Sequence, residues 1–90
     1  MANIDKIRET IGKIGQPPKN VTAAEIEWVI NQLEQHGFQV RRRKTLHGIL
    51  YVVNSSRFSI CTHHPGSKQI RACYVHEFLR AMMEIGLYED

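Results

Sequence analysis

The sequence predicts an α+β fold in which a three-stranded antiparallel sheet carries two helices on one face, preceded by an N-terminal helical extension. Two observations predict it. Apolar residues recur at helical spacing in residues 3–14, 22–36 and 71–85. Between residues 38 and 62 the spacing changes to a period of two, interrupted by turn residues. Because the two main helices cover only one side of the sheet, we expect the other side to face solvent.

Residues 1–21 are expected to form a helical extension and a linker ahead of a single domain at 22–90. Four isoleucines fall at helical spacing and predict a short amphipathic helix over residues 3–14: Ile4, Ile7, Ile11 and Ile14. The sequence Gly15-Gln16-Pro17-Pro18 ends this helix, since proline and glycine interrupt helical backbone.

The second helix is expected at residues 22–36. Thr22 and Glu25 have the spacing of a capping box, in which each side chain satisfies a free amide at the helix start. Its apolar stripe consists of Ile26, Val29, Ile30 and Leu33. Gly37 is a good C-terminal stop, and His36 before it suits the negative end of the helix dipole.

Three strands are expected next, at residues 38–44, 47–53 and 57–62, with Asn54-Ser55-Ser56 as a hairpin turn. Short connections predict an antiparallel meander. In the first strand the alternation places Phe38, Val40, Arg42 and Lys44 on one face and Gln39, Arg41 and Arg43 on the other.

A loop beginning at His63-His64-Pro65-Gly66 precedes the last helix, which is expected at residues 71–85 and ends at Gly86. Its aromatic and methionine stripe is interpreted as core packing. The stripe consists of Tyr74, Phe78, Met82 and Ile85, with Val75 and Leu79 beside it.

Charge is strongly polarised along the chain. Between Phe38 and Cys73 there is no acidic residue, while seven residues are basic: Arg41, Arg42, Arg43, Lys44, Arg57, Lys68 and Arg71. The flanking segments are acidic, so the net charge is only +3. A one-sided positive charge is typical of a protein that binds a polyanion. The alternative is that the charged run is only a solvated face.

The composition argues against several other classes. No apolar run reaches the roughly 18–20 residues of a membrane span, and no signal peptide is apparent, so we expect a cytoplasmic protein. Cys61 and Cys73 are expected to be reduced and buried. A zinc site made from them with His63 and His64 is not favoured, because the spacing fits no common structural zinc pattern.

Several motifs together resemble the HicA family of toxins. A helix ends at Gly37-Phe38, a basic strand follows, and His47 leads into an apolar strand. The third strand then runs to His64-Pro65-Gly66, and the last helix ends in Ile85-Gly86-Leu87. HicA proteins are small RNA-cleaving partners of HicB antitoxins, with a fold like the double-stranded-RNA-binding domain. The resemblance covers residues 25–88, about two thirds of the chain.

The resemblance implies a metal-independent endoribonuclease that cleaves mRNA without a cofactor and is covered by an acidic HicB-like antitoxin. His47 matches the family's catalytic histidine. The family commonly has Gly-Ser before that histidine, whereas this chain has Lys44-Thr45-Leu46. Gly48 after it would still let a phosphate backbone come close. The residues expected to bind RNA are Arg41, Arg43, Lys44, Arg57, His64 and Lys68.

The chemistry is consistent with these assignments. RNA cleaves itself when a 2′-hydroxyl attacks the adjacent phosphate, and an imidazole with a pKa of about 6.5 can transfer either proton. Arginine or lysine nearby stabilises the charge on the phosphorane. Two alternatives stay open: a non-catalytic RNA-binding module of the same fold, and a protein-interaction domain whose basic face serves only an acidic partner.

Overall fold

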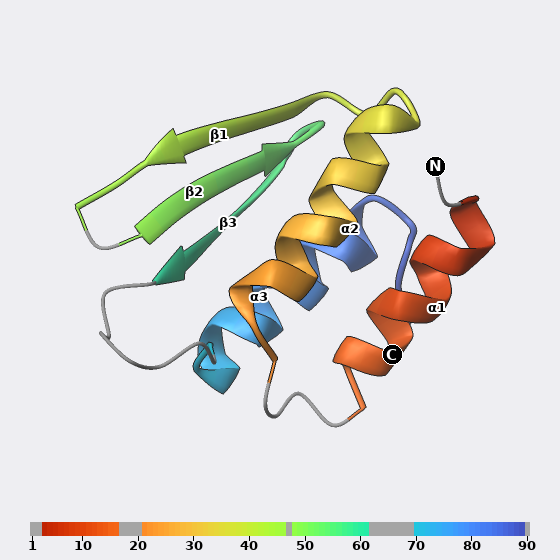
Figure 1. The fold of residues 1–90 in the computed structure, drawn as a ribbon, viewed down its shortest axis with the longest axis horizontal. Helices are drawn as coiled ribbons and strands as arrows, with labels where there is room; N and C mark the ends of the chain where they lie inside the picture. The colour runs from red at the N-terminus through yellow and green to blue at the C-terminus, as the bar shows by residue number, and fades with distance from the viewer. Residues whose placement is uncertain (1–2, 17–20, 47, 62–69, 90) are drawn as a thin grey trace.

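The computed structural model describes residues 3–16, 21–46, 48–61 and 70–89. In these residues the chain forms three helices and a three-stranded sheet, and the α+β class expected from the sequence is confirmed (Figure 1). The elements, in chain order, are α1 (Ile4–Ile14), α2 (Ala23–Gln35), β1 (Val40–Lys44), β2 (Gly48–Val53), β3 (Ser56–Cys61) and α3 (Ala72–Glu84).

The ends of α2 and α3 follow the capping signals of the sequence. The Thr22 hydroxyl accepts a hydrogen bond from the Glu25 amide, and the Glu25 carboxylate accepts one from the Thr22 amide, which completes the capping box. Gly37 and Gly86 have φ angles of +96° and +84°, respectively. This left-handed conformation favours glycine and turns the chain sharply out of each helix.

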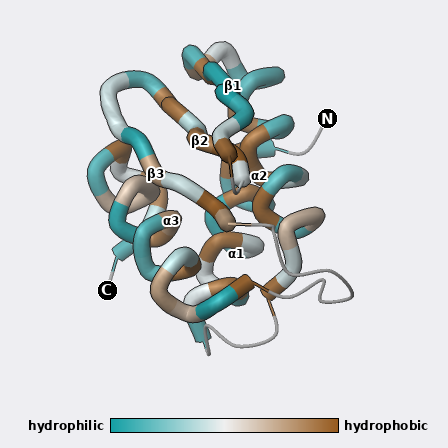
Figure 2. The backbone as a smooth tube through the Cα atoms, turned by 90° about the vertical axis from the view of Figure 1, so that its left-hand side faces the viewer, coloured by the Kyte–Doolittle hydropathy of each residue, from teal (hydrophilic) through white to brown (hydrophobic). Residues whose placement is uncertain are grey.

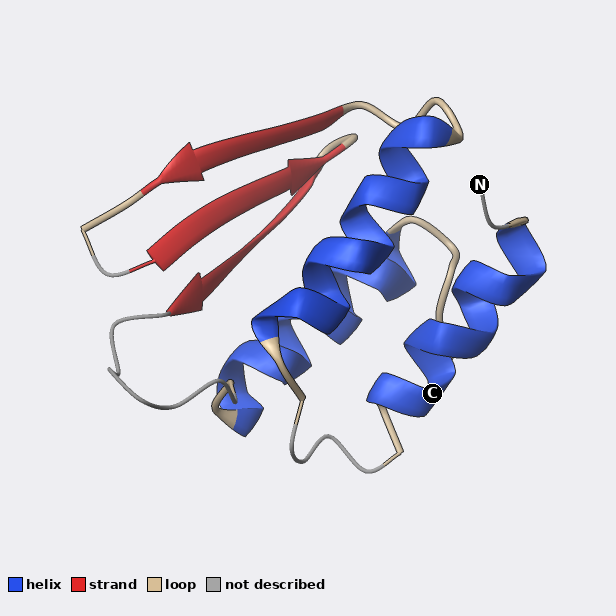
Figure 3. Ribbon diagram, in the orientation of Figure 1, coloured by secondary structure: helices blue, strands red, loops and turns tan. Residues whose placement is uncertain are grey.

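The sheet is an antiparallel meander in the order β1-β2-β3. Asn54, with φ of +55°, forms the β2–β3 turn and also extends the β1–β2 ladder. Its amide donates to the Gln39 carbonyl at 2.7 Å, and its side-chain Oδ1 accepts from the Gln39 amide at 3.0 Å. In Figure 3 the helices lie together on one side of the sheet, and no described helix covers the other side.

The buried face of the sheet packs its aromatic residues in a row. The rings of Tyr51 and Phe58 stack at 5.2 Å between centroids, and Phe58 meets Phe78 of α3 edge to face at 5.4 Å. Figure 2 shows the contrast between strands, with hydrophilic residues along β1 and hydrophobic ones along β2. The edge strand β1 is therefore largely exposed and positively charged.

Helix α1, expected as an extension, packs on α2 and α3 and shares their core. Its Ile7, Ile11 and Ile14 are buried in the same hydrophobic cluster as the sheet residues. The C-terminal segment holds α1 in place, since the Arg8 guanidinium donates to the Gly86 carbonyl at 3.1 Å. A Cβ at Gly15 would lie 2.5 Å from the Tyr88 hydroxyl oxygen, so a larger residue at this position would displace the Tyr88 ring.

None of the helices in the described ranges is long and apolar enough to cross a membrane.

Candidate nucleic-acid interface

Three arginines lie on the uncovered face of the sheet. The register places Arg41 opposite Val52, and Val52 opposite Arg57, so two arginines flank one valine across the three strands. The next row on that face consists of Arg43, Leu50 and Ser59. We call this surface the cationic face; its arginines are exposed, and Leu50 and Val52 are half-buried.

The spacing of the cationic face suits a chain of phosphates. Arg41 and Arg43 are two residues apart on one strand, which corresponds to about 6–7 Å. Arg57 lies two strands away from Arg41, which corresponds to about 10 Å. None of the three strands contains an acidic residue that could neutralise these charges from within the sheet.

Lys44 does not share this face. It pairs with Ile49, whose next partner across the sheet is the buried Ile60, so Lys44 alternates onto the helix-facing side together with Arg42. The sequence interpretation grouped Lys44 with Arg43 on one binding surface, whereas strand alternation separates them. Lys44 is exposed at the end of β1.

Arg42 is held by helix α2. Its Nε donates to Glu27 at 2.9 Å, Nη1 to Glu34 at 3.3 Å and Nη2 to Asn31 at 2.8 Å. The guanidinium carbon also lies 6.0 Å from the centroid of the Tyr51 ring, within range of a cation–π interaction. Partial burial acts to lower the pKa of Arg42, but Glu27 and Glu34 outweigh it and the pKa rises.

Tyr51 completes this network from the centre of the sheet. Its hydroxyl donates to Glu27 Oε2, so one carboxylate binds both the tyrosine and Arg42. Burial raises the pKa of Tyr51 above its usual value, and the hydrogen bond to Glu27 and the charge of that carboxylate raise it further. We call Glu27, Asn31, Glu34, Arg42 and Tyr51 the α2–β1 network. Sequence reasoning missed it, although its three α2 residues have helical spacing.

Three of the site residues expected from the sequence, His47, His64 and Lys68, lie outside the described residues. Gly48, next to His47 in the sequence, is described and has a packing role that the sequence did not predict. A Cβ at this position would overlap the backbone carbonyl oxygen of Ile60 on β3. Close packing of β2 against β3 therefore requires glycine at this position, whether or not a phosphate approaches.

Neither Cys61 nor Cys73 forms a disulfide, but the expectation that both are buried is wrong. Cys61 is half-buried, whereas Cys73 is exposed. Cys73 lies in the first turn of α3, and the buried stripe of that helix begins with Val75, so Cys73 faces away from the core. Within the described ranges, no three residues of the types His, Cys, Asp and Glu are grouped so that they could hold a metal ion.

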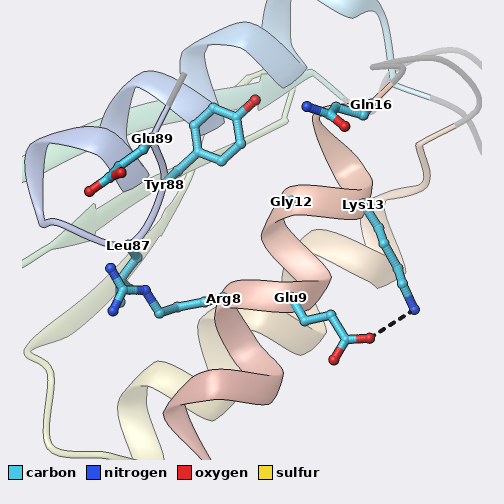
Figure 4. Close-up of a pocket in the computed structure, with 8 residues that line it drawn as sticks. All are labelled: Arg8, Glu9, Gly12, Lys13, Gln16, Leu87, Tyr88 and Glu89. Atoms are coloured by element: carbon cyan, nitrogen blue, oxygen red, sulfur yellow. Dashed lines mark ion pairs between the residues drawn. The ribbon is translucent and has the colours of Figure 1, made fainter.

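A depression lies between α1 and the C-terminal segment (Figure 4). Tyr88 and Gln16 line it, and two cations at its wall already have partners. Arg8 donates to the Gly86 carbonyl, and Lys13 pairs with Glu9 at 3.2 Å. The Arg8 contact links α1 to the C-terminal segment, whereas the Lys13–Glu9 pair lies within α1. Because both cations already have partners, the cationic face is the stronger candidate for binding.

No family model, curated protein or solved structure matches the chain. The family resemblance therefore depends on the sequence motifs given above.

Proposed function

We propose that this protein binds RNA through the cationic face and cleaves it as the endoribonuclease toxin of a toxin–antitoxin pair. One observation carries the binding part of the proposal. Arg41, Arg43 and Arg57 are gathered from two different strands onto a sheet face that no described helix covers. Such a surface recognises phosphates, which supply most of the affinity of a protein for nucleic acid.

The order of the elements supports the family part of the proposal. A helix, a three-stranded meander and a second helix on the same face of the sheet are what a HicA-like protein with a fold like the double-stranded-RNA-binding domain would have. In the sequence, His47 immediately precedes Gly48, the first residue of β2. In this proposal His47 is the general acid or base, and the arginines stabilise the phosphorane.

An acidic antitoxin of the HicB type is the proposed partner. It would cover the cationic face, because a protein rich in carboxylates complements the same guanidinium groups that bind phosphate. RNA and the antitoxin would then compete for one surface.

The test separates cleavage from binding. His47→Ala should keep the RNA affinity of the wild-type chain and lower its cleavage rate by about 10²–10⁴-fold. His76→Ala is the matched control, because His76 is an exposed histidine on α3 and should change neither quantity. Expression of the wild-type chain should arrest growth, and His47→Ala should relieve the arrest.

Two other outcomes would contradict the proposal in different ways. Wild-type protein that binds RNA tightly but never cleaves any RNA, even at high protein concentration, would be a non-catalytic RNA-binding module. Protein that binds no RNA at low salt, where phosphate contacts are strongest, would be a protein-interaction domain.

A further inference from the structure

A groove crosses the edge of β3 beside the cationic face. Its volume is about 350 Å³, near the lower end of the range usual for small-molecule sites. The sheet contributes residues from β2 and β3, and α3 contributes the opposite wall. The residues that line it are Leu50, Arg57, Phe58, Ser59, Tyr74 and Glu77. We call it the β3 groove. A volume of this size suits one planar ring system.

The groove has an apolar part made of an aliphatic and an aromatic side chain. Leu50 is half-buried on the uncovered side of β2, directly opposite Ser59 of β3. Tyr74 is half-buried and comes from the first turns of α3. Its hydroxyl interacts with Cys61, whose charge and hydrogen bond raise the pKa of Tyr74. Since Cys61 lies two residues after Ser59, Tyr74 reaches β3 and is held beside the groove.

The polar part of the groove is an acidic side chain held in place by Arg80. Arg80 donates to Glu77 at 2.8 Å, to Glu84 at 3.0 Å and to the main-chain carbonyl of Arg57 at 3.1 Å. Glu77 is thereby fixed next to the edge of β3. The bond from Arg80 uses Oε2, and within the described residues Oε1 of Glu77 accepts no hydrogen bond.

The edge of β3 adds main-chain groups. The Arg57 carbonyl points away from β2, because it accepts a hydrogen bond from Arg80 of α3. In an antiparallel ladder, residues two apart direct their main-chain groups the same way. Ser59 therefore also directs its N–H and C=O outward, into the groove that it lines.

Arg57 belongs to both the groove and the cationic face. A ligand that fills the groove would therefore lie next to an arginine proposed to bind phosphate. A nucleotide has this arrangement, because its base and its phosphate are neighbours. The groove itself carries the carboxylate of Glu77, which repels phosphate. An uncharged ring with hydrogen-bond donors fits it better than a second phosphate does.

We infer that the β3 groove binds one unpaired nucleobase that bears an exocyclic amino group, in an RNA whose phosphates lie on the cationic face. This inference rests on the proposed RNA-binding function. An ionised carboxylate can only accept hydrogen bonds, so Glu77 favours adenine and cytosine, which present amino donors, over uracil at the corresponding position. The Tyr74 ring provides a stacking surface for the base.

The test measures affinities of the full chain for single-stranded oligoadenylate, oligocytidylate and oligouridylate of equal length, by fluorescence anisotropy. The wild-type chain should bind the first two about tenfold more tightly than oligouridylate. In Glu77→Gln the preference should shrink to about twofold, since an amide both donates and accepts. Glu84→Gln is the matched control. It removes the other carboxylate that Arg80 binds, and Glu84 does not line the groove, so the preference for oligoadenylate and oligocytidylate should remain.

Tyr74 variants test the stacking part. Tyr74→Leu should weaken binding of all three oligonucleotides roughly five- to hundredfold, whereas Tyr74→Phe, which keeps the ring, should bind like the wild type. Circular dichroism checks that each variant is folded. If Tyr74→Leu does not fold, the comparison of Glu77→Gln with the wild type still tests the site, because Glu77 is exposed and its replacement should not affect folding.

The outcomes separate this inference from the proposed function. Equal affinity of the wild-type chain for the three oligonucleotides, or a preference that survives Glu77→Gln, would overturn the nucleobase site while RNA binding stands. Absence of binding to every RNA at low salt would instead overturn the proposed function.

Discussion

Arg42 and its two neighbours in β1 have the same side chain, but the two faces of the strand give them different surroundings. The side chain of Arg42 is 29% exposed and donates to Glu27, Glu34 and Asn31 of α2. Arg41 and Arg43 are exposed on the opposite face, where the strands carry no carboxylate. Consecutive arginines in one strand therefore have different roles. Because side chains alternate between the two faces, Arg42 stabilises the fold, whereas Arg41 and Arg43 are available to a ligand.

The largest expected effect concerns the available arginines. Replacing Arg41 and Arg43 together by Gln should weaken RNA binding about ten- to hundredfold and reduce the salt dependence of the affinity by a slope of about 1 to 2. Affinity measured at several salt concentrations checks this. The free energy of unfolding should change by less than about 0.5 kcal/mol, because both side chains are exposed. An unchanged salt slope would show that RNA binds elsewhere.

The next effect concerns Arg42. Arg42→Gln should lower the free energy of unfolding by about 1–2 kcal/mol, because it breaks charge-assisted hydrogen bonds and leaves Glu27 and Glu34 without their cation. Urea denaturation provides the measurement, and Arg41→Gln, one residue away on the opposite face, is the control. Equal stability of these two single variants would mean that the α2–β1 network does not stabilise the fold.

The smallest effect is a pH dependence of stability. Tyr51 is only 3% exposed, and its pKa is raised in the folded state relative to the unfolded chain, where it is about 10. Above about pH 10 the unfolded chain loses this proton while the folded chain keeps it, so stability should fall as pH rises. Tyr51→Phe should reduce that decline. Identical slopes above pH 10 in the two proteins would contradict the assignment to Tyr51.

Most of the fold could be predicted because the responsible signals are local. The capping box at Thr22, the glycine stop at Gly37 and the two-residue alternation from Phe38 onward each depend on neighbours in sequence. The alternation also predicted correctly that Arg41 and Arg43 share a face. The packing of α1 on the other helices could not be predicted, because the contact between Gly15 and Tyr88 joins the two ends of the chain.

The candidate site was less predictable, since its arrangement depends on long-range contacts. The partners of Arg42 lie 8 to 15 residues away, on a helix whose rotation relative to the sheet the sequence does not reveal. The close packing of Gly48 against the backbone of β3 was not predicted either, because Ile60 is twelve residues away in the sequence. The β3 groove joins Leu50 and Ser59 to residues of α3, and only the folded chain places these elements together.

The most direct test of RNA binding by the cationic face compares how the guanidinium groups of the individual arginines respond to RNA. In an NMR titration of the protein with a short RNA, the side-chain Nε–H signal of each arginine can be followed separately. We expect the signals of Arg41, Arg43 and Arg57 to shift as RNA is added, while the Arg42 signal stays in place because Glu27 already binds its Nε. Shifts confined to Arg8 and Arg80, with the cationic face unchanged, would contradict this expectation.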